Sequence, residues 1–276
     1  MMIRSDIHIH TSFSSDCDEP MENQIERAIS LGLDTLCFTE HMDKDYPSDP
    51  SREKSHLPEF MLDTDAYRAK FLELKEKYAA RIRLLFGVEL GLQPHLSKWC
   101  ADYVSRYDFD YIIGSVHTIG RMDPYYASFF EGRSEREAYE QYFEEALADI
   151  KGFYDFDSLG HLDYVVRYGP NKNKEYSYRE YADLIDPILV KLIDKGIALE
   201  ANSAGYRKGL GEPNPCKDVL KRYKELGGQL VTIGSDAHRA DSMCCDFPRL
   251  EALLRDCGFR YHAVYIGRTP ELHPLG

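Results

Sequence analysis

Six of the ten histidines lie in short motifs that also carry acidic residues or glycine, and these motifs recur along most of the chain. The motifs are Asp6-Ile7-His8-Ile9-His10, Thr39-Glu40-His41, Gly87-Val88-Glu89, Gly114-Ser115-Val116-His117, Gly160-His161 and Gly234-Ser235-Asp236-Ala237-His238. Each falls where a predicted strand ends, so we interpret them as one dispersed metal site. Imidazole nitrogen binds zinc, iron and manganese, and a carboxylate can bridge two such ions. Bound ions lower the pKa of water towards about 7 and clamp the oxygens of a phosphoryl group during its transfer.

The spacing in the first motif suits a metal ion. Alternate side chains of a strand share a face, so His8 and His10 can reach one ion, with Asp6 on the same face. A His-x-His pair also occurs at the polar rim of a barrel without binding an ion. The further motifs at corresponding strand ends favour the metal site over that alternative.

Strands and helices that would position these motifs alternate along the chain. Hydrophobic patterns predict strands at residues 3–10, 34–39, 82–89, 111–117, 157–161, 197–201, 229–235 and 261–266. Helices are predicted at residues 20–31, 63–80, 96–106, 135–150, 178–195, 217–226 and 247–257. Alternation of this kind implies a parallel sheet, and seven or eight such units favour a single α/β barrel domain over residues 1–276. The active site is then expected at the carboxyl ends of the strands.

Two loop excursions are expected beside that site. Residues 42–62 form a polar segment with several prolines that is too long for a simple connection. Residues 118–134 contain a loop signal followed by the aromatic run 125–130, which forms either a lid or part of the core. The histidines outside the motifs are expected at the surface: His56, His95, His262 and His273.

Composition excludes several classes of protein. The chain is 43% hydrophobic and 29% charged, and no apolar run approaches the roughly 18 residues of a membrane span. The first motif begins at Asp6, which leaves no room for a signal peptide and predicts a cytoplasmic protein with reduced cysteines. The net charge of −13 argues against long nucleic acids as partners but allows a small phosphorylated substrate. The sequence does not predict the oligomeric state.

The ordered motifs, with Gly160-His161-Leu162-Asp163 and Glu200-Ala201-Asn202-Ser203, resemble the PHP (polymerase and histidinol phosphatase) family. The resemblance extends from residue 6 to residue 238. It implies a distorted (β/α)7 TIM-like barrel that carries two to three divalent metal ions, with zinc, manganese and iron as the candidates.

The resemblance also implies which residues of this chain would bind the first two metal ions. The first ion would be held by His8, His10, Glu89 and Asp236. Glu89 would also bridge to the second ion, whose other ligands are His117 and His161.

A third ion would be held by His41, His238 and the residue six places after His10. Many relatives have histidine there, but this chain has Asp16, with Asp18 as the alternative in the same turn. The substitution replaces imidazole by a harder oxygen donor. The sequence therefore predicts two ions and leaves the third site open.

Three further carboxylates are expected to support the metal ligands without binding a metal ion themselves. Glu40 adjoins His41 and would point away from it on an extended strand, which predicts a supporting role. Asp6 and Glu200 are expected to orient ligand imidazoles through the ring N–H.

Two arginines and two of the proposed ligands are the candidates for substrate chemistry. Arg167 and Arg207 follow strands that bear ligands, in segments that resemble stand-alone histidinol phosphatases, and are expected to grip phosphate oxygens. A surface salt bridge is the alternative for each arginine. Asp236 or His238 is expected to donate a proton to the leaving alcohol.

These expectations favour a phosphomonoesterase that hydrolyses L-histidinol phosphate in histidine biosynthesis. Asp43, Asp45 and Tyr46 are expected to receive the cationic part of that substrate. The alternatives are a PHP phosphoesterase for nucleotides or another small phosphomonoester, and a metal-binding protein without catalytic activity.

Overall fold

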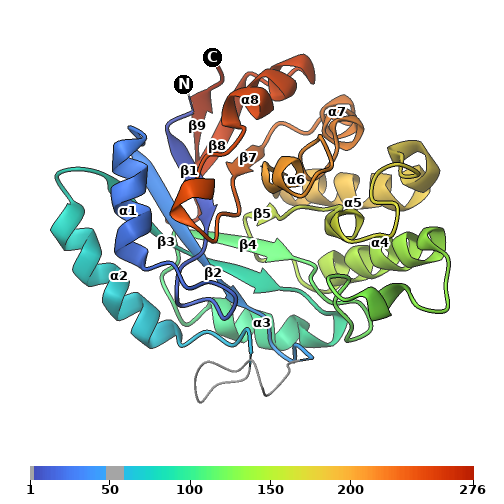
Figure 1. Cartoon of the computed structure of the whole chain (residues 1–276), viewed down its shortest axis with the longest axis horizontal. Coiled ribbons are helices and arrows are strands. Elements are labelled where there is room, and N and C mark those ends of the chain that lie inside the picture. Colours follow the sequence, from blue (N-terminus) through green and yellow to red (C-terminus); the bar gives the residue numbers. More distant parts are fainter. Residues whose placement is uncertain (1–2, 48–58) are drawn as a thin grey trace.

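The computed structural model describes residues 3–47 and 59–276. In these residues, seven parallel strands lie side by side in chain order, from β1 to β7, with helices outside them (Figure 1). The strands are β1 (Ser5–Ile9), β2 (Thr35–Met42), β3 (Arg83–Gly91), β4 (Tyr111–Ser115), β5 (Ser158–Leu159), β6 (Ala198–Asn202) and β7 (Val231–Gly234). The α-helices are α1 (Met21–Ser30), α2 (Thr64–Tyr78), α3 (Ser97–Val104), α4 (Glu135–Gly152), α5 (Ala182–Lys195), α6 (Ala204–Arg207), α7 (Lys217–Glu225) and α8 (Phe247–Asp256).

The sheet curls into a nearly closed barrel, as predicted. The chain after β7 returns to β1, where Asp236 N donates to His8 O at 2.9 Å and His10 N donates to Ala237 O at 3.0 Å. The approach is close, because a Cβ atom at Gly234 would lie 2.3 Å from the Cβ of His8. Glycine is therefore required where the last strand meets the first.

Register in the barrel sets which side chains meet at its mouth. In the β2–β3 pair, His41 lies opposite Glu89, and in the β6–β7 pair Asn202 lies opposite Gly234. Side chains two residues apart in a strand share a face. Cys37 and Leu85 therefore lie on the inner face below His41 and Glu89, and belong to an apolar cluster inside the barrel.

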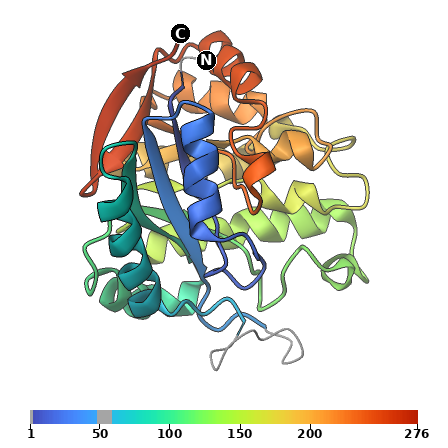
Figure 2. The same ribbon diagram turned by 60° about the vertical axis from the view of Figure 1, so that its left-hand side comes forward.

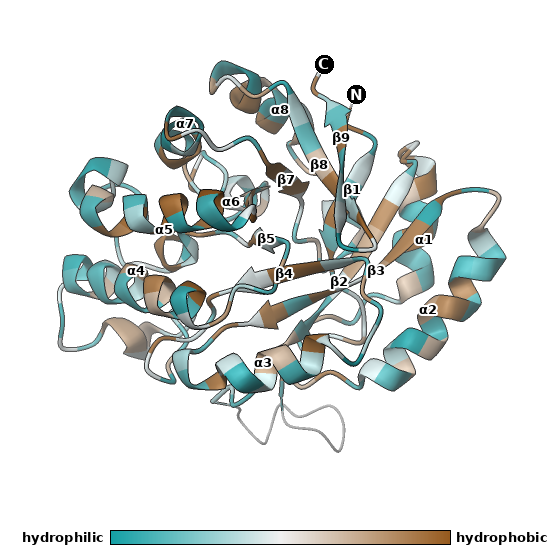
Figure 3. Ribbon diagram, turned by 180° about the vertical axis from the view of Figure 1, so that it is seen from behind, coloured by the Kyte–Doolittle hydropathy of each residue, from teal (hydrophilic) through white to brown (hydrophobic). Residues whose placement is uncertain are grey.

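The helices cover the outside of the barrel with one apolar face each. In α1, for example, Met21, Ile25 and Ala28 are buried, at the spacing of a helix that packs on a sheet. The strands carry much of the hydrophobic colour in Figure 3, whereas the helices mix both colours. Among the described residues, no helix has the length and apolar character that crossing a bilayer requires.

One predicted strand is much shorter than expected. Residues 157–161 were expected to be a strand, but β5 contains only Ser158 and Leu159. The regular backbone pairing ends there, because the backbone N–H of His161 donates to the side-chain carboxylate of Glu200 in β6 at 2.9 Å instead of to a backbone carbonyl. The backbone pairing of β5 therefore ends just before His161, whose side chain points into the site.

The last predicted strand does not belong to the barrel, so of the seven or eight expected units the barrel has seven. β8 (Tyr261–Ile266) pairs antiparallel with β9 (Thr269–Pro274), a strand that the sequence did not predict. Figure 2 shows this hairpin beside the barrel, near both chain termini. Ala263, Val264 and Tyr265 pack into the apolar cluster inside the barrel, and the Tyr265 ring stacks on Tyr111 at 5.3 Å. The hairpin closes the end of the barrel opposite the mouth.

The turn of the hairpin is tied to the barrel by Arg268. Its guanidinium donates to Asp157 at 2.7 Å and to Asp155 at 3.0 Å. Asp157 is only 7% exposed and also accepts the backbone N–H of Ile112 at 2.8 Å. Removal of one member of a buried ion pair leaves the other charge without compensation.

We therefore expect Arg268→Ala to lower the free energy of unfolding by about 2 kcal/mol, measured by denaturant titration. Arg4→Ala is the control, since the Arg4–Asp34 pair is 58% exposed on both sides and such pairs contribute less than about 1 kcal/mol. Equal effects of the two substitutions would show that the hairpin does not depend on this contact.

Candidate metal centre

Glu89 is the centre of the candidate site. Its carboxylate is fully buried at the end of β3. The Oε2 atom lies 3.2 Å from His8 Nε2, 3.3 Å from His10 Nε2 and 3.0 Å from His41 Nδ1. Burial raises the pKa of Glu89, but the surrounding imidazoles outweigh that effect and hold it well below its usual range. The carboxylate is an anion that faces ring nitrogens from two other strands.

The other oxygen of Glu89 faces two more imidazoles. Oε1 lies 3.1 Å from His117 Nε2 and 2.9 Å from His161 Nε2. His117 follows β4 and His161 follows β5, so the next two strands of the barrel supply them. One carboxylate is thus shared between two groups of histidines, as a bridging ligand must be.

The unsatisfied atoms at this centre fit a metal ion. His8 Nε2, His10 Nε2, His41 Nδ1 and Glu89 Oε2 are buried, and none has a hydrogen-bond partner among the described residues. A buried polar atom without a partner costs about 1–3 kcal/mol. Several such atoms converge on one point, where a cation would satisfy them together. The geometry groups His8 with His10 and Asp236, and again with Glu89 and His161, as sets that could hold an ion.

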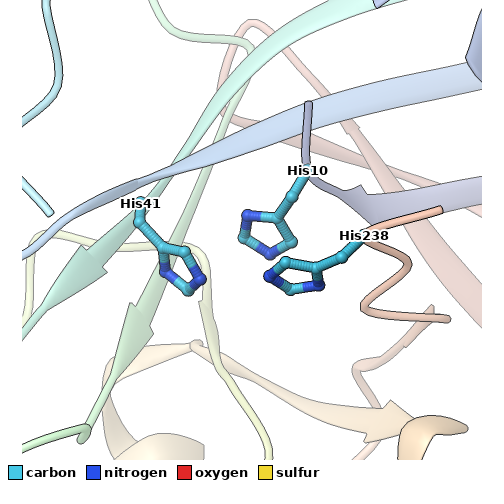
Figure 4. Close-up of side chains that lie close together, drawn as sticks. All are labelled: His10, His41 and His238. Carbon is cyan, nitrogen blue, oxygen red and sulfur yellow. The ribbon is translucent and has the colours of Figure 1, made fainter. Parts of the chain in front are cut away.

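A second part of the cluster contains the residues predicted for a third ion. The rings of His10, His41 and His238 point toward one another (Figure 4). The His10 ring stacks on the rings of His41 and His238, with centroid distances of 4.1 and 4.2 Å. Asp16 Oδ2 lies 3.1 Å from His238 Nε2 and 3.7 Å from His41 Nε2. Asp16, the favoured carboxylate of this turn, therefore contacts two of the three imidazoles.

Asp236 lies between the two parts of the cluster. Its Oδ1 is 3.6 Å from His10 Nε2 and 3.9 Å from His8 Nε2, and its Oδ2 accepts Arg167 Nη1 at 2.9 Å. The residue has a φ of 54°, a left-handed conformation that costs energy outside glycine. Such strain persists where the surrounding structure holds a side chain in a required place.

Glu200 supports the ligands as predicted, whereas Asp6 does not. Glu200 Oε1 lies 2.6 Å from His8 Nδ1, which orients the ring through its second nitrogen. Asp6 accepts the backbone N–H groups of Ser235 at 3.0 Å and Cys244 at 3.1 Å, and contacts no imidazole among the described residues. The reason is an irregularity of β1 between Asp6 and Ile9, which breaks the alternation that the prediction assumed.

Asp43 has a contact that the sequence did not predict. It was expected beside the substrate and does line the cavity described below, and its Oδ1 also lies 2.7 Å from His117 Nδ1. It follows β2 and stands two residues after His41, so the shared face of the two residues was the available signal. Asp45, expected beside it, contacts the exposed His95 at 3.2 Å.

Both predicted arginines lie at the site and not in surface salt bridges. Arg167 is 4% exposed and donates to Asp236, to Asn214 at 2.8 Å and to Asn202 at 3.1 Å. These bonds use three of its five N–H donors. Arg207 donates to Ser235 O at 2.8 Å and to Asp236 O at 3.1 Å. The sequence analysis gave no role to Asn202, which it quoted only as part of a motif, or to Asn214, which lies in none of the motifs.

A cavity of about 450 Å³ opens above the cluster, and both arginines line it. Its outer wall is formed mainly by phenol rings, from Tyr46, Tyr125, Tyr126, Tyr164 and Tyr168. Asp123 also lines the wall and accepts Tyr46 OH at 2.8 Å and Tyr125 N at 2.7 Å. The aromatic run 125–130 is divided, since its first two residues line the cavity and Phe129 is buried in the core.

Of the described histidines outside the motifs, His95, His262 and His273, none lines this cavity, but one prediction about them is wrong. His262 is 2% exposed in β8, where burial lowers its pKa to about 4. It faces His273 across the hairpin, with ring centroids 5.6 Å apart. A strand of this hairpin was not recognised, so its buried face was not predicted. His56 lies outside the described residues.

Known proteins share this chain's sequence pattern and fold. The family model described as PHP domain matches residues 6–204. The chain belongs to the PHP family. This PHP protein is 32% identical over 258 residues to a probable histidinol-phosphatase of Clostridium acetobutylicum, covering 92% of this chain and 94% of that protein. It is 30% identical over 267 residues to the histidinol-phosphatase of Lactococcus lactis, covering 96% of each.

Two solved structures share the fold of this chain. The histidinol phosphate phosphatase of Lactococcus lactis, complexed with zinc, L-histidinol and phosphate, matches this PHP barrel with a TM-score of 0.88 and 29% identity, over 97% of this chain and 98% of that chain. A structure from Listeria monocytogenes matches with a TM-score of 0.76 at 21% identity, over 89% of this chain and 99% of that chain, which shows a shared fold.

Glu89→Gln tests whether the central carboxylate holds metal. The amide keeps the shape but loses the charge that attracts cations, so we expect bound metal per chain to fall and phosphatase turnover to drop more than about 100-fold. Metal content is measured by atomic emission on protein purified without chelator. Glu251→Gln, in α8, is the matched control and should keep its metal. Full metal content in Glu89→Gln would contradict the central role of this carboxylate.

Proposed function

We propose that this PHP protein hydrolyses L-histidinol phosphate to L-histidinol and inorganic phosphate with the help of divalent metal ions. The observation that carries the proposal is the Glu89 carboxylate among five imidazoles at the base of a cavity lined by charged side chains and tyrosines. The family and the named histidinol-phosphatases similar to the chain support it.

Two or three ions are proposed, with ligands assigned as the family pattern implies. His8, His10, Glu89 and Asp236 would hold the first, and Glu89, His117 and His161 the second. His41, His238 and Asp16 would hold a third. Zinc is favoured by the donor set and is bound in the similar Lactococcus lactis structure, while manganese and iron suit the same donors.

The side chains around the ions are proposed to bind phosphate and move one proton. Bound metal ions supply Lewis acidity and make water a nucleophile at neutral pH. Arg167 and Arg207 would hold phosphate oxygens, since a guanidinium offers a planar, permanently charged fork. Asp236 and His238 line the cavity and are the candidates to protonate the leaving alcohol. Burial raises the pKa of Asp236, but Arg167 and the neighbouring imidazoles outweigh that effect and hold it well below its usual range, which favours His238 as the donor. Arg167 also holds Asp236 in place through its bond at 2.9 Å.

The outer wall of the cavity suits the cationic part of histidinol phosphate. Asp123 is 6% exposed and offers a carboxylate beside several phenol rings. A carboxylate attracts an ammonium or imidazolium group, and aromatic faces bind flat rings and cations. We propose residues 118–134 as a loop that shapes this wall, within a single domain over residues 1–276. Of the second expected excursion, residues 42–62, Tyr46 and Phe60 line the cavity, and residues 48–58 lie outside the described part of the chain.

A nucleotide is the alternative substrate, because the same phenol rings could stack a base. Turnover of L-histidinol phosphate should therefore be compared with turnover of mononucleotides and p-nitrophenyl phosphate, on zinc-, manganese- or iron-loaded protein. We expect kcat/KM for L-histidinol phosphate to exceed that for nucleotides by at least about 100-fold, since a site built for polar groups discriminates strongly. A preference for nucleotides would refute the proposed substrate. Absence of turnover with every metal would favour a binding protein.

Asp123→Asn tests recognition of the cationic part separately. Removal of the charge should raise KM for L-histidinol phosphate about tenfold or more, because a charge-assisted hydrogen bond contributes roughly 1.5–3 kcal/mol. Turnover of p-nitrophenyl phosphate, which lacks an ammonium group, should change less than about twofold. Equal losses on both substrates would show that Asp123 only supports the fold of the loop.

A further inference from the structure

The hydrogen bonds around Ser14 determine where the proton of the His10 ring lies. Ser14 is in the turn after β1 and is 1% exposed. Its Oγ lies 2.6 Å from Glu40 Oε2, 3.1 Å from the backbone N of His41 and 3.2 Å from His10 Nδ1. A hydroxyl has one proton to donate and two lone pairs that accept. The three contacts therefore use the full capacity of this hydroxyl.

Two of the three contacts have a fixed direction. The backbone N–H of His41 can only donate, so Ser14 Oγ accepts there. Glu40 Oε2 also accepts the backbone N–H of Thr11 at 3.0 Å, which identifies this oxygen as an acceptor. The hydroxyl proton of Ser14 therefore goes to Glu40. The other carboxylate oxygen accepts the hydroxyl of Thr11 at 2.6 Å and holds Glu40 in this orientation.

The remaining contact fixes the imidazole. With its proton given to Glu40, Ser14 Oγ can only accept from His10, so the ring carries its proton on Nδ1. His10 Nε2 then presents a lone pair towards Glu89 Oε2, 3.3 Å away, and Asp236 Oδ1, 3.6 Å away. Nε2 is buried and has no hydrogen-bond partner among the residues that the structure describes. A metal ligand must present such a lone pair.

We propose that Ser14 is a positioning residue that fixes the Nδ1-protonated tautomer of His10 and so prepares this imidazole for metal binding. Glu200 and Asp43 contact the Nδ1 atoms of His8 and His117 directly, at 2.6 and 2.7 Å. At His10 the carboxylate of Glu40 acts through an interposed hydroxyl. The inference deepens the proposed function, because it rests on His10 as a metal ligand, but it does not depend on the identity of the substrate.

Ser14→Ala, in the full-length chain, tests the proposal through zinc affinity. Without Oγ, the Nδ1–H of His10 loses its acceptor and the ring is free to take the other tautomer. We expect the affinity of the metal-free protein for Zn²⁺ to fall about 10–100-fold, as for loss of other groups that orient ligands. Ser12→Ala is the matched control, since Ser12 lies in the same turn with an exposed side chain, and should bind zinc as the wild type does. Unchanged zinc affinity in folded Ser14→Ala would overturn the proposal.

Nitrogen-15 NMR of the metal-free wild type gives a second test that needs no variant. The His10 ring should show a protonated Nδ1 and an unprotonated Nε2, and a protonated Nε2 would refute the assignment even if Ser14→Ala failed to fold. Neither measurement uses a substrate. A chain that binds zinc as expected but does not hydrolyse L-histidinol phosphate would refute the proposed function and leave the role of Ser14 intact.

Discussion

The buried carboxylate of Glu89 is the constraint on which the rest of this structure depends. A fully buried anion is costly unless opposite charge surrounds it, and five imidazole nitrogens lie within 3.3 Å of its two oxygens. Neutral imidazoles direct lone pairs at the same place, so the arrangement is favourable with cations between the groups. The barrel must bring the ends of successive strands to one point, and the in-register pairing of β2 with β3 places His41 opposite Glu89.

Behind the ring nitrogens lies a set of acceptors that orients them. Glu200 lies behind His8, Asp43 behind His117, and Ser14 with Glu40 behind His10. These groups come from β6, from the end of β2 and from the turn after β1, so the orientation of the ligands is distributed over the barrel. Ligand geometry then depends on the whole fold and not on any single loop.

The two ends of the barrel differ in structure and in polarity. At one end the β8–β9 hairpin and the apolar cluster around Tyr111 and Tyr265 close the interior. At the other end the polar cluster opens into a cavity lined by arginines and phenol rings. An apolar floor keeps water from reaching the buried charges from below, which strengthens electrostatic interactions at the mouth.

The sequence by itself determined the alternation of strands and helices and the residues whose side chains meet at the mouth, because parallel strands bring their carboxyl ends together whatever their exact length. His8, Glu89 and Asp236 could be predicted from motif and order alone. Glu200 was expected behind these side chains, but only the tertiary structure decided which other groups orient the ligands. Asp6 left its expected face because β1 is irregular, Asp43 contacts His117, and Ser14 bonds to two neighbouring residues of β2. Hydrogen bonds between distant segments follow from packing and leave no periodic signal in the chain.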